Sequence, residues 1–355
     1  MNKKILMKGN EAIAEAAVRG GCRYFFGYPI TPQNEIPEYM AARLPEVQGV
    51  FIQAESEVSA INMVYGAAGA GARAMTSSSS PGISLKQEGI SYIAGAELPC
   101  VIVNMVRSGP GLGGIMTSQG DYFQSVKGGG HGDYRLLVYS PSTVQEAVDI
   151  TYNAFDKADK YRIPVLILGD AMLGQIMEGV SMPEMKDTKK FPPKPWATTG
   201  KGEGGSRTVI NSLYIKADEL EAINNRLNNL YKEMSLKEVL AEEYMCEDAE
   251  IILTAYGSVG RIAKSAVNML REKGVKAGLI RPITLYPFPS ETYDKLIVRG
   301  NVEEIWDIEL SSFGQMIEDV RLAVSGKVPV RYYGRSGGNV MTDEDIAAVV
   351  LKGGK

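Results

Sequence analysis

The chain has 355 residues and a formal net charge of -4, with 38 basic and 42 acidic side chains. This length favours two compact units with a connecting segment. The absence of clustered Lys and Arg disfavours nucleic-acid binding, and the longest apolar run, residues 163–168, is far too short to span a bilayer.

Targeting signals and reactive side chains are scarce. The start of the sequence, MNKKILMKGN, lacks the apolar stretch of a secretory signal, so we expect a cytoplasmic protein. Cys22, Cys100 and Cys246 have no CxxC spacing and are predicted to be reduced thiols. His131 is the only histidine, which excludes a histidine-rich metal site and argues against a Ser-His-Asp triad. The chemistry must therefore depend on carboxylates, arginine or a cofactor.

Helical periodicity alternates with short β-rich runs from residue 10 to about residue 170. This alternation predicts an α/β fold in which a parallel sheet carries helices on both faces. The predicted strands are residues 24–27, 50–53, 74–77, 100–105 and 164–169. The predicted helices are residues 11–19, 35–43, 57–68, 83–94 and 144–160. In such sheets, ligands bind at the carboxyl ends of the strands, so the turns after the strands are the candidate site.

The rest of the chain is predicted to form a connector and a second, smaller α/β unit. Residues 183–206 are rich in Pro, Lys and Gly and predict a linker. A charged helix is predicted from about residue 217 to residue 243. The second unit has predicted strands at residues 251–255, 277–280, 305–308 and 328–333. We therefore predict three parts, which are residues 1–182, residues 183–248 and residues 249–355.

One glycine motif points to another class of enzyme. Residues 69–74, GAGARA, match the GxGxxA form of the dinucleotide-binding fingerprint, which would indicate a nicotinamide-dependent dehydrogenase. That fingerprint needs a strand before it and a helix after it. Here a predicted helix precedes it and a predicted strand follows, so the motif is interpreted as a packed helix end. The dehydrogenase remains an alternative.

Four turns at the ends of predicted strands carry conspicuous motifs. They are GYPITP at residues 27–32, QAESE at residues 53–57, SSSSPG at residues 77–82 and RSGPGLGG at residues 107–114. Their order and spacing resemble the thiamine-diphosphate pyrimidine-binding domain of 2-oxoacid:ferredoxin oxidoreductases. SQGDY at residues 118–122 and KGGGHG at residues 127–132 are most similar to the branched-chain (3-methyl-2-oxobutanoate, or 2-ketoisovalerate) type. YGS at residues 256–258 and GRSGG at residues 334–338 resemble the family's transketolase C-terminal domain.

The resemblance implies that Glu57 is the catalytic carboxyl group. Thiamine diphosphate becomes reactive when its aminopyrimidine changes tautomer, and a carboxyl group hydrogen-bonded to the ring nitrogen drives that change. Glu57 stands at the family's position for this group, so it is also assigned to cofactor binding. The alternative is that Glu57 only stabilises a helix N-terminus, by about 0.3 to 1 kcal/mol.

Arg107 follows a predicted buried strand, where a cation needs an anionic partner to offset desolvation. We expect it to bind the substrate carboxylate through two parallel hydrogen bonds. The alternative is a structural ion pair with Asp121 or Glu97. The resemblance implies that Thr31 forms a hydrogen bond with substrate or cofactor, and the alternative is that its hydroxyl group closes the turn. The resemblance also implies that the cofactor cleft is lined by Pro29, Thr31, Ser79 and Ser80.

Two expected motifs are missing from the sequence. It has no GDG motif followed by Asn to hold Mg²⁺ and the diphosphate, and no cysteines at iron-sulfur spacing. No metal ligand is therefore predicted in this chain. The resemblance implies that partners supply these parts: a diphosphate-binding beta-type subunit, a gamma-type subunit and a small ferredoxin-like subunit, with [4Fe-4S] clusters among them.

The implied reaction is the oxidative decarboxylation of a branched-chain 2-oxoacid to acyl-CoA and CO2, with coenzyme A as co-substrate and external ferredoxin as acceptor. The protein would orient the reactants, while the cofactor carries the carbanion chemistry. Two further alternatives remain open, which are a preference for 2-oxoglutarate and a non-catalytic scaffold role in such a complex.

Overall fold

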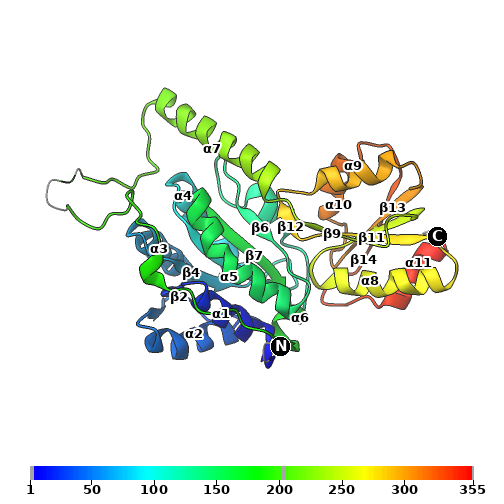
Figure 1. Ribbon diagram of the computed structural model, residues 1–355, viewed down its shortest axis with the longest axis horizontal. Coiled ribbons are helices and arrows are strands. Elements are labelled where there is room, and N and C mark those ends of the chain that lie inside the picture. The colour runs from blue at the N-terminus through cyan, green and yellow to red at the C-terminus, as the bar shows by residue number, and fades with distance from the viewer. Residues whose placement is uncertain (1–3, 202–204, 206, 354–355) are drawn as a thin grey trace.

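The structure is a computed structural model that describes residues 4–201, 205 and 207–353. It contains two α/β units, a larger one from the N-terminal part of the chain and a smaller one towards the C-terminus (Figure 1). The predicted α/β fold class is confirmed.

The larger unit contains a seven-stranded sheet with the strand order β12-β6-β7-β5-β4-β2-β3. Neighbouring strands pair in parallel, except that β12 runs antiparallel to β6. The strands are β2 (Tyr24–Gly27), β3 (Val50–Gln53), β4 (Ala74–Ser78), β5 (Cys100–Val106), β6 (Leu137–Tyr139), β7 (Pro164–Asp170) and β12 (Thr284–Tyr286).

Helices cover both faces of this sheet because its central strands are apolar on both sides. In β5, Val101 and Val103 face one core, while Cys100 and Ile102 face the other, as expected from the alternation of side chains along a strand. One core is completed by α3 (Glu57–Gly69) and α4 (Ser80–Gly95). The other is completed by α1 (Gly9–Arg19), α2 (Glu35–Glu46) and α5 (Val144–Tyr161).

The smaller unit contains a five-stranded sheet with the strand order β14-β13-β10-β11-β9, in which β9 runs antiparallel to β11 and the other neighbours pair in parallel. The strands are β9 (Ala241–Tyr244), β10 (Ile251–Thr254), β11 (Ala277–Pro282), β13 (Glu304–Glu309) and β14 (Val330–Gly334). One face packs on α8 (Gly257–Glu272) and α11 (Asp343–Leu351). The other packs on α9 (Ser290–Val298) and α10 (Met316–Val324).

Several short elements complete the described chain. The strands β1 (Ile5–Lys8) and β8 (Met177–Val180) form an antiparallel pair beside the larger unit. The remaining short pieces are α6 (Ala171–Gln175), a π-helical turn (Gln124–Gly128) and a 3-10 turn (Thr188–Lys190). None of the helices in the described part of the chain is long and apolar enough to cross a membrane.

The connector differs from its prediction. Helix α7 (Ala217–Lys237) runs along the outside of the larger unit (Figure 1), but the expectation that it continues to residue 243 is wrong. Residues 241–244 form β9 instead, because they pair with the edge of β11. Glu242 of this strand also forms an ion pair with Arg281, at 2.7 Å between Oε2 and Nε.

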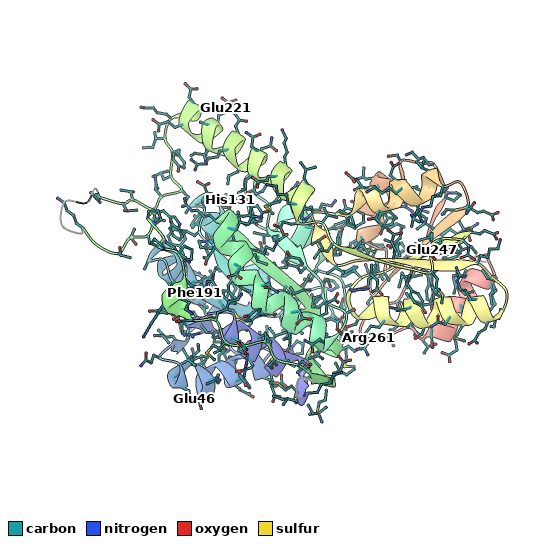
Figure 2. The ribbon with its side chains drawn as sticks, in the orientation of Figure 1. Glu46, His131, Phe191, Glu221, Glu247 and Arg261 are labelled. Atoms are coloured by element: carbon teal, nitrogen blue, oxygen red, sulfur yellow. The ribbon has the colours of Figure 1, made fainter. Side chains whose placement is uncertain are left out.

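Two short strands cross the predicted divisions of the chain. β9 comes from the predicted connector but belongs to the second sheet, and β12 comes from the predicted C-terminal unit but pairs with β6 in the first sheet. The division at residues 182 and 248 therefore stays a prediction. Each sheet includes one strand that comes from a different predicted part of the chain. Figure 2 labels Arg261 at the boundary between the units, where its Nη1 lies 2.6 Å from Glu178 Oε1.

Candidate functional site

The four motif-bearing turns lie at one edge of the first sheet. Strands β3, β2, β4 and β5 are neighbours and run in parallel, so their carboxyl ends meet at the same edge. GYPITP begins with the last residue of β2, and QAESE begins with the last residue of β3. SSSSPG begins with the last two residues of β4, and RSGPGLGG begins directly after β5 ends. This edge is where an open α/β sheet binds its ligand.

Glu57 is the first residue of α3, and its side chain is buried, with 6% of the residue exposed. The start of the helix is fixed by Ser56, whose Oγ accepts a hydrogen bond from Ser59 N at 3.2 Å. The helix N-terminus is therefore capped by a residue other than Glu57, which leaves the Glu57 carboxyl group available to a ligand.

Gly82, in the first turn of α4, is in close contact with Glu57. A Cβ atom at this position would lie 2.6 Å from Glu57 Oε1 and 2.0 Å from Ser78 Oγ. Only a residue without a side chain can therefore bring α4 this close to the carboxyl group. Gly82 belongs to the SSSSPG motif, but this contact could not be predicted from the sequence.

The last three of the four serines at residues 77–80 have different surroundings. The Oγ atoms of Ser78 and Ser79 are buried and have no hydrogen-bond partner among the described residues. Ser80 Oγ instead accepts from Arg107 N at 3.1 Å and lies 3.2 Å from Arg107 O. Buried hydroxyl groups without partners are rare in folded proteins. Together with the buried Glu57 carboxyl group, they fit a polar ring such as an aminopyrimidine.

Arg107 joins two of the turns. Its side chain is largely buried, and its Nη1 and Nη2 donate to the carbonyl oxygens of Thr31 and Leu112, both at 3.1 Å. Its Nε is buried and finds no acceptor in residues 4–201, 205 and 207–353. The Thr31 contact uses the main chain, and the side chains of Thr31 and Pro29 are exposed.

The expected alternative ion pairs of Arg107 are not formed. Asp121 Oδ2 accepts from Asn104 Nδ2 at 2.8 Å, and the partner of Glu97 is Arg226 on α7. Burial raises the pKa of the Asp121 carboxyl group above its usual value. Arg107 is thus a buried cation that contacts only carbonyl oxygens through its guanidinium group, within the described chain.

Lys86 was not identified by the sequence analysis. It lies on α4 one turn after Gly82, and its side chain is fully buried. Burial lowers the pKa of its amino group to about 8, and the nearby Glu57 carboxylate partly offsets that effect. Its signal in the sequence is its spacing, because Ile83, Lys86 and Ile90 lie on the same face of a helix.

His131 (Figure 2) contacts helix α4 and is not part of the four motif-bearing turns. Its carbonyl oxygen accepts a hydrogen bond from Ser91 Oγ at 2.6 Å, and its ring packs edge-on against Tyr92. Metal ligands do not gather elsewhere either. In the described chain, no group of three or more His, Cys, Asp or Glu side chains could hold a metal ion.

The second unit closes one side of the site. Gln119 Nε2 donates to Tyr256 O at 2.9 Å, and its Oε1 accepts from Leu310 N at 2.9 Å. Asp170, at the end of β7, accepts from Ser258 Oγ at 2.9 Å, and burial raises the pKa of its carboxyl group. These buried contacts hold the segment after RSGPGLGG against the second unit.

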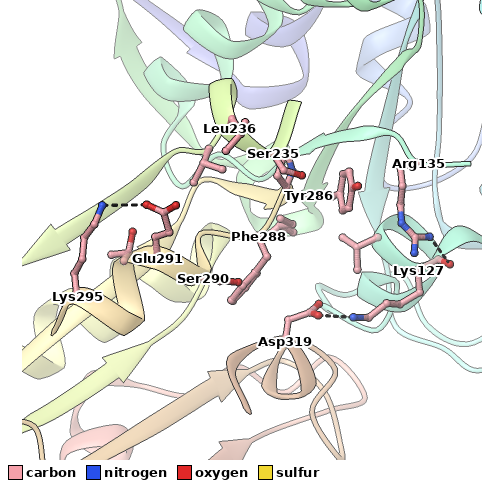
Figure 3. Close-up of a pocket in the computed structure, with 15 residues that line it drawn as sticks. Lys127, Arg135, Ser235, Leu236, Tyr286, Phe288, Ser290, Glu291, Lys295 and Asp319 are labelled. Carbon is pink, nitrogen blue, oxygen red and sulfur yellow. Dashed lines mark hydrogen bonds and ion pairs between the residues drawn. The ribbon is translucent and has the colours of Figure 1, made fainter. Parts of the chain in front are cut away.

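A cavity of about 740 Å³ lies elsewhere, between the C-terminal end of α7, strand β12 and the second unit (Figure 3). Its cations are engaged locally, because Lys127 pairs with Asp319 and Lys295 with Glu291. None of the residues of the four motifs lines it. The cavity is therefore separate from the strand-end site.

Comparison with known proteins identifies the class. Residues 15–242 match the family described as pyruvate flavodoxin/ferredoxin oxidoreductase, thiamine diphosphate-binding. Residues 249–346 match the pyruvate:ferredoxin oxidoreductase core domain II. The chain therefore belongs to the family of thiamine-diphosphate-binding 2-oxoacid:ferredoxin oxidoreductases, as the sequence motifs predicted. It is an alpha-type subunit of this class of enzyme.

The relatives point to one branch of the family. Ketoisovalerate oxidoreductase subunit VorB of Methanothermobacter marburgensis is 51% identical over 341 residues, which cover 96% of this chain and 95% of the relative. 2-Oxoglutarate synthase subunit KorA of Methanocaldococcus jannaschii is 37% identical over 371 residues, which cover 97% and 98%. The similarity to the branched-chain type, predicted from two loop motifs, is confirmed.

Solved structures agree with this class. The 2-oxoglutarate:ferredoxin oxidoreductase from Magnetococcus marinus, with 2-oxoglutarate, coenzyme A and succinyl-CoA bound, superposes with a TM-score of 0.89 at 26% identity. The match covers all of this chain but 66% of that one, so this chain spans about two thirds of its length. A split-gene transketolase shares the fold, with a TM-score of 0.57 at 14% identity.

Proposed function

We propose that this chain binds the pyrimidine half of thiamine diphosphate in a complex that oxidises 3-methyl-2-oxobutanoate to acyl-CoA and CO2. The observation that carries the proposal is the buried Glu57 carboxyl group in close contact with Gly82, at the sheet edge formed by the family motifs. The relative named for ketoisovalerate, at 51% identity, supports the choice of substrate.

Glu57 is proposed as the catalytic residue. Thiamine diphosphate, when bound, supplies a carbanion that attacks a keto carbon. Glu57 would hydrogen-bond the pyrimidine nitrogen and transfer a proton to it. The buried hydroxyl groups of Ser78 and Ser79, which lack partners within the described chain, would line the same pocket. Ser80 would act indirectly, since its hydroxyl group is bonded to the main chain of Arg107.

Arg107 is proposed to bind the substrate carboxylate. A guanidinium group whose described contacts are carbonyl oxygens keeps its full positive charge for an incoming anion. Arg107 contacts both the GYPITP turn and the RSGPGLGG loop, so substrate binding would restrict the motion of both segments. Thr31 and Pro29, which are exposed on the first of these turns, would contact the substrate or the cofactor.

The site is proposed to be completed by other subunits. Within residues 4–201, 205 and 207–353 no cluster of potential ligands could hold Mg²⁺, so a beta-type subunit would hold the diphosphate and the metal ion. The loop beside Arg107 exposes apolar side chains, with Leu112 84% and Ile115 58% exposed. Such a surface is typical of a subunit interface. The partners would also include a gamma-type and a small ferredoxin-like subunit, and partner subunits would carry the [4Fe-4S] clusters. The complex would work in the cytoplasm, with coenzyme A as co-substrate and external ferredoxin as acceptor.

The test is the reduction of methyl viologen by the co-expressed complex. We expect coenzyme-A-dependent activity that is highest with 3-methyl-2-oxobutanoate and falls by a factor of about 10² to 10⁴ in Glu57→Gln, since a proton-transfer group typically contributes that much. The matched control is Glu55→Gln, because Glu55 is exposed in the same turn. Unchanged turnover in Glu57→Gln would instead make this chain a scaffold.

A 2-oxoglutarate preference is the second candidate, and the relatives named for 2-oxoglutarate favour it. Its distal carboxylate would need a second cation in the substrate cleft. Lys86 is a second buried cation near the site, but its side chain has no exposed surface. The same assay with 2-oxoglutarate and pyruvate as substrates separates these candidates.

A further inference from the structure

Lys86 is a buried cation that packing alone does not explain. Its side chain is 0% exposed on α4. Among the residues that the structure describes, no atom accepts a hydrogen bond from its Nζ. A buried ammonium group without a hydrogen-bonded partner is strongly unfavourable. An apolar side chain of similar length would fill the same space without that cost, so the charge itself requires a reason.

Glu57 is the only charged residue of α3, the helix that packs against α4. Helix α4 packs against α3, where Glu57 is the first residue, and the Glu57 carboxylate raises the pKa of the Lys86 amino group against the effect of burial. Strands β4 and β5 beneath α4 have no charged residues. Asp170 at the end of β7 is bonded to Ser258. Glu88 on α4 is exposed and accepts from Tyr92 at 2.6 Å.

We propose that Lys86 is a positioning residue for Glu57, whose ammonium charge stabilises the ionised form of the Glu57 carboxyl group. This inference rests on the proposed function. When Glu57 transfers its proton to the pyrimidine nitrogen, an O–H bond breaks, an N–H bond forms and a buried carboxylate remains. A nearby positive charge stabilises that carboxylate and therefore favours the transfer. Lys86 thus acts on the cofactor only through Glu57.

This assignment explains the position of Lys86 one turn beyond Gly82. Gly82 brings the start of α4 against Glu57 Oε1, and the side chain one turn later lies on the face of α4 that is buried with α3 in the same core. Lys86 and Glu57 are therefore buried on two helices that pack together, and Lys86 has no exposed surface that a substrate could contact.

The test is a double-mutant cycle in the co-expressed complex, with the native chain, Glu57→Gln, Lys86→Met and the double variant. The readout is the exchange of the cofactor C2 proton for deuterium, followed by NMR after acid quenching, which does not require turnover. We expect Lys86→Met to slow exchange by about tenfold or more, and to add no further slowing to Glu57→Gln. Lys276→Met, which removes an exposed lysine far from the site, is the matched control.

The outcomes separate the two proposals. Slow exchange in Glu57→Gln with native exchange in Lys86→Met overturns the inference about Lys86 alone. Equal slowing by Lys86→Met in both backgrounds also overturns it, because Lys86 would then act independently of Glu57. Native exchange in Glu57→Gln overturns the proposed function together with the inference.

A second measurement does not depend on the cofactor. The pKa of Lys86, about 8 in the folded chain, is below its ordinary value of 10.5. The unfolded chain therefore binds more protons between these values, and native stability should rise with pH across that window. We expect the full-length Lys86→Met chain to melt several degrees above the native chain at pH 7, with an advantage that shrinks from pH 8 to pH 10.5. If Lys86→Met melts at a lower temperature than the native chain at every pH, and Lys86→Gln does the same, then the Lys86 side chain contributes packing and its charge has no role.

Discussion

At the scale of single residues, Gly82 leaves room for both the Glu57 carboxyl group and the Ser78 hydroxyl group of the candidate site. Glu57 comes from the start of α3 and Ser78 from the end of β4, and both reach the space that a side chain on Gly82 would occupy. The requirement is steric rather than conformational, since Gly82 lies in an ordinary helical turn.

We predict that Gly82→Ala inactivates the complex while leaving the fold intact. The added Cβ would displace the Glu57 carboxyl group or the Ser78 hydroxyl group, and overpacking of this kind costs about 1 to 3 kcal/mol of stability. We expect a loss of activity of about 10²-fold, measured by methyl-viologen reduction. The matched control is Gly66→Ala on α3, where a Cβ would have no neighbour within 4 Å among the described atoms and should be neutral or slightly stabilising. Native activity in Gly82→Ala would show that the contact does not constrain Glu57.

The sequence could supply part of this site. Glu57 and Arg107 were identified because they lie in motifs at strand ends and because those motifs resemble a known family. The role of Arg107 in joining two turns through the Thr31 and Leu112 carbonyl groups could not be predicted, since it depends on loop geometry. Lys86 was missed for a related reason. A lysine in a helix is usually solvated, and its burial depends on how α4 packs on α3.

At the scale of elements, the central strands of the first sheet were predictable because each is a short β-rich run between turns. The strands β6 and β12, at one end of this sheet, were not. β6 and β12 have only three residues each, and β12 is formed through pairing with a distant part of the chain. The C-terminal end of α7 was misplaced because the residues after Lys237 continue a charged, helix-compatible composition. Their pairing with β11 overrides that local preference.

The C-terminal helix provides a test of local stability that should not affect function. Thr342 begins α11 with a capping box, in which its Oγ1 accepts from Asp345 N at 3.1 Å and Asp345 Oδ2 accepts from Thr342 N at 3.1 Å. We predict that Thr342→Ala lowers the free energy of unfolding by about 1 kcal/mol. Urea denaturation would measure this loss, and viologen reduction should stay at the native rate. A stability change below a few tenths of a kcal/mol would mean that the cap is replaced by water.

At the scale of the whole molecule, the two units are joined by buried charge. Arg281 on β11 binds Glu146 on α5 through two contacts, at 2.8 Å and 3.0 Å, and also binds Glu242. This bidentate pair and the Gln119 contacts hold the second unit in a defined position against the first unit, beside the site.

The second sheet also contains a buried acid that should make stability depend on pH. Burial, with a smaller contribution from the Glu309 carboxylate, raises the pKa of the Asp307 carboxyl group well above its usual value. The folded chain therefore binds more protons than the unfolded chain above pH 3.8, and this contribution to stability falls as pH rises. We predict that Asp307→Asn reduces the loss of unfolding free energy with rising pH. In the native chain this loss can reach about 1.4 kcal/mol per pH unit.

Urea unfolding of the native and Asp307→Asn chains at several pH values between 5 and 8 would measure this difference. Asp248→Asn is the control, because Asp248 is an exposed residue of the same unit. Parallel profiles for the native and Asp307→Asn chains would mean that Asp307 is not held in its protonated form by the fold.

Strand β12 also has a consequence for the order in which the protein is made. The edge of β6 that β12 covers is synthesised long before residues 284–286 leave the ribosome, and domains generally begin to fold while synthesis continues. For that interval the nascent first sheet has an open edge, which is a template for unwanted pairing. Chains that end before residue 284 should therefore be more prone to aggregate than chains that contain β12.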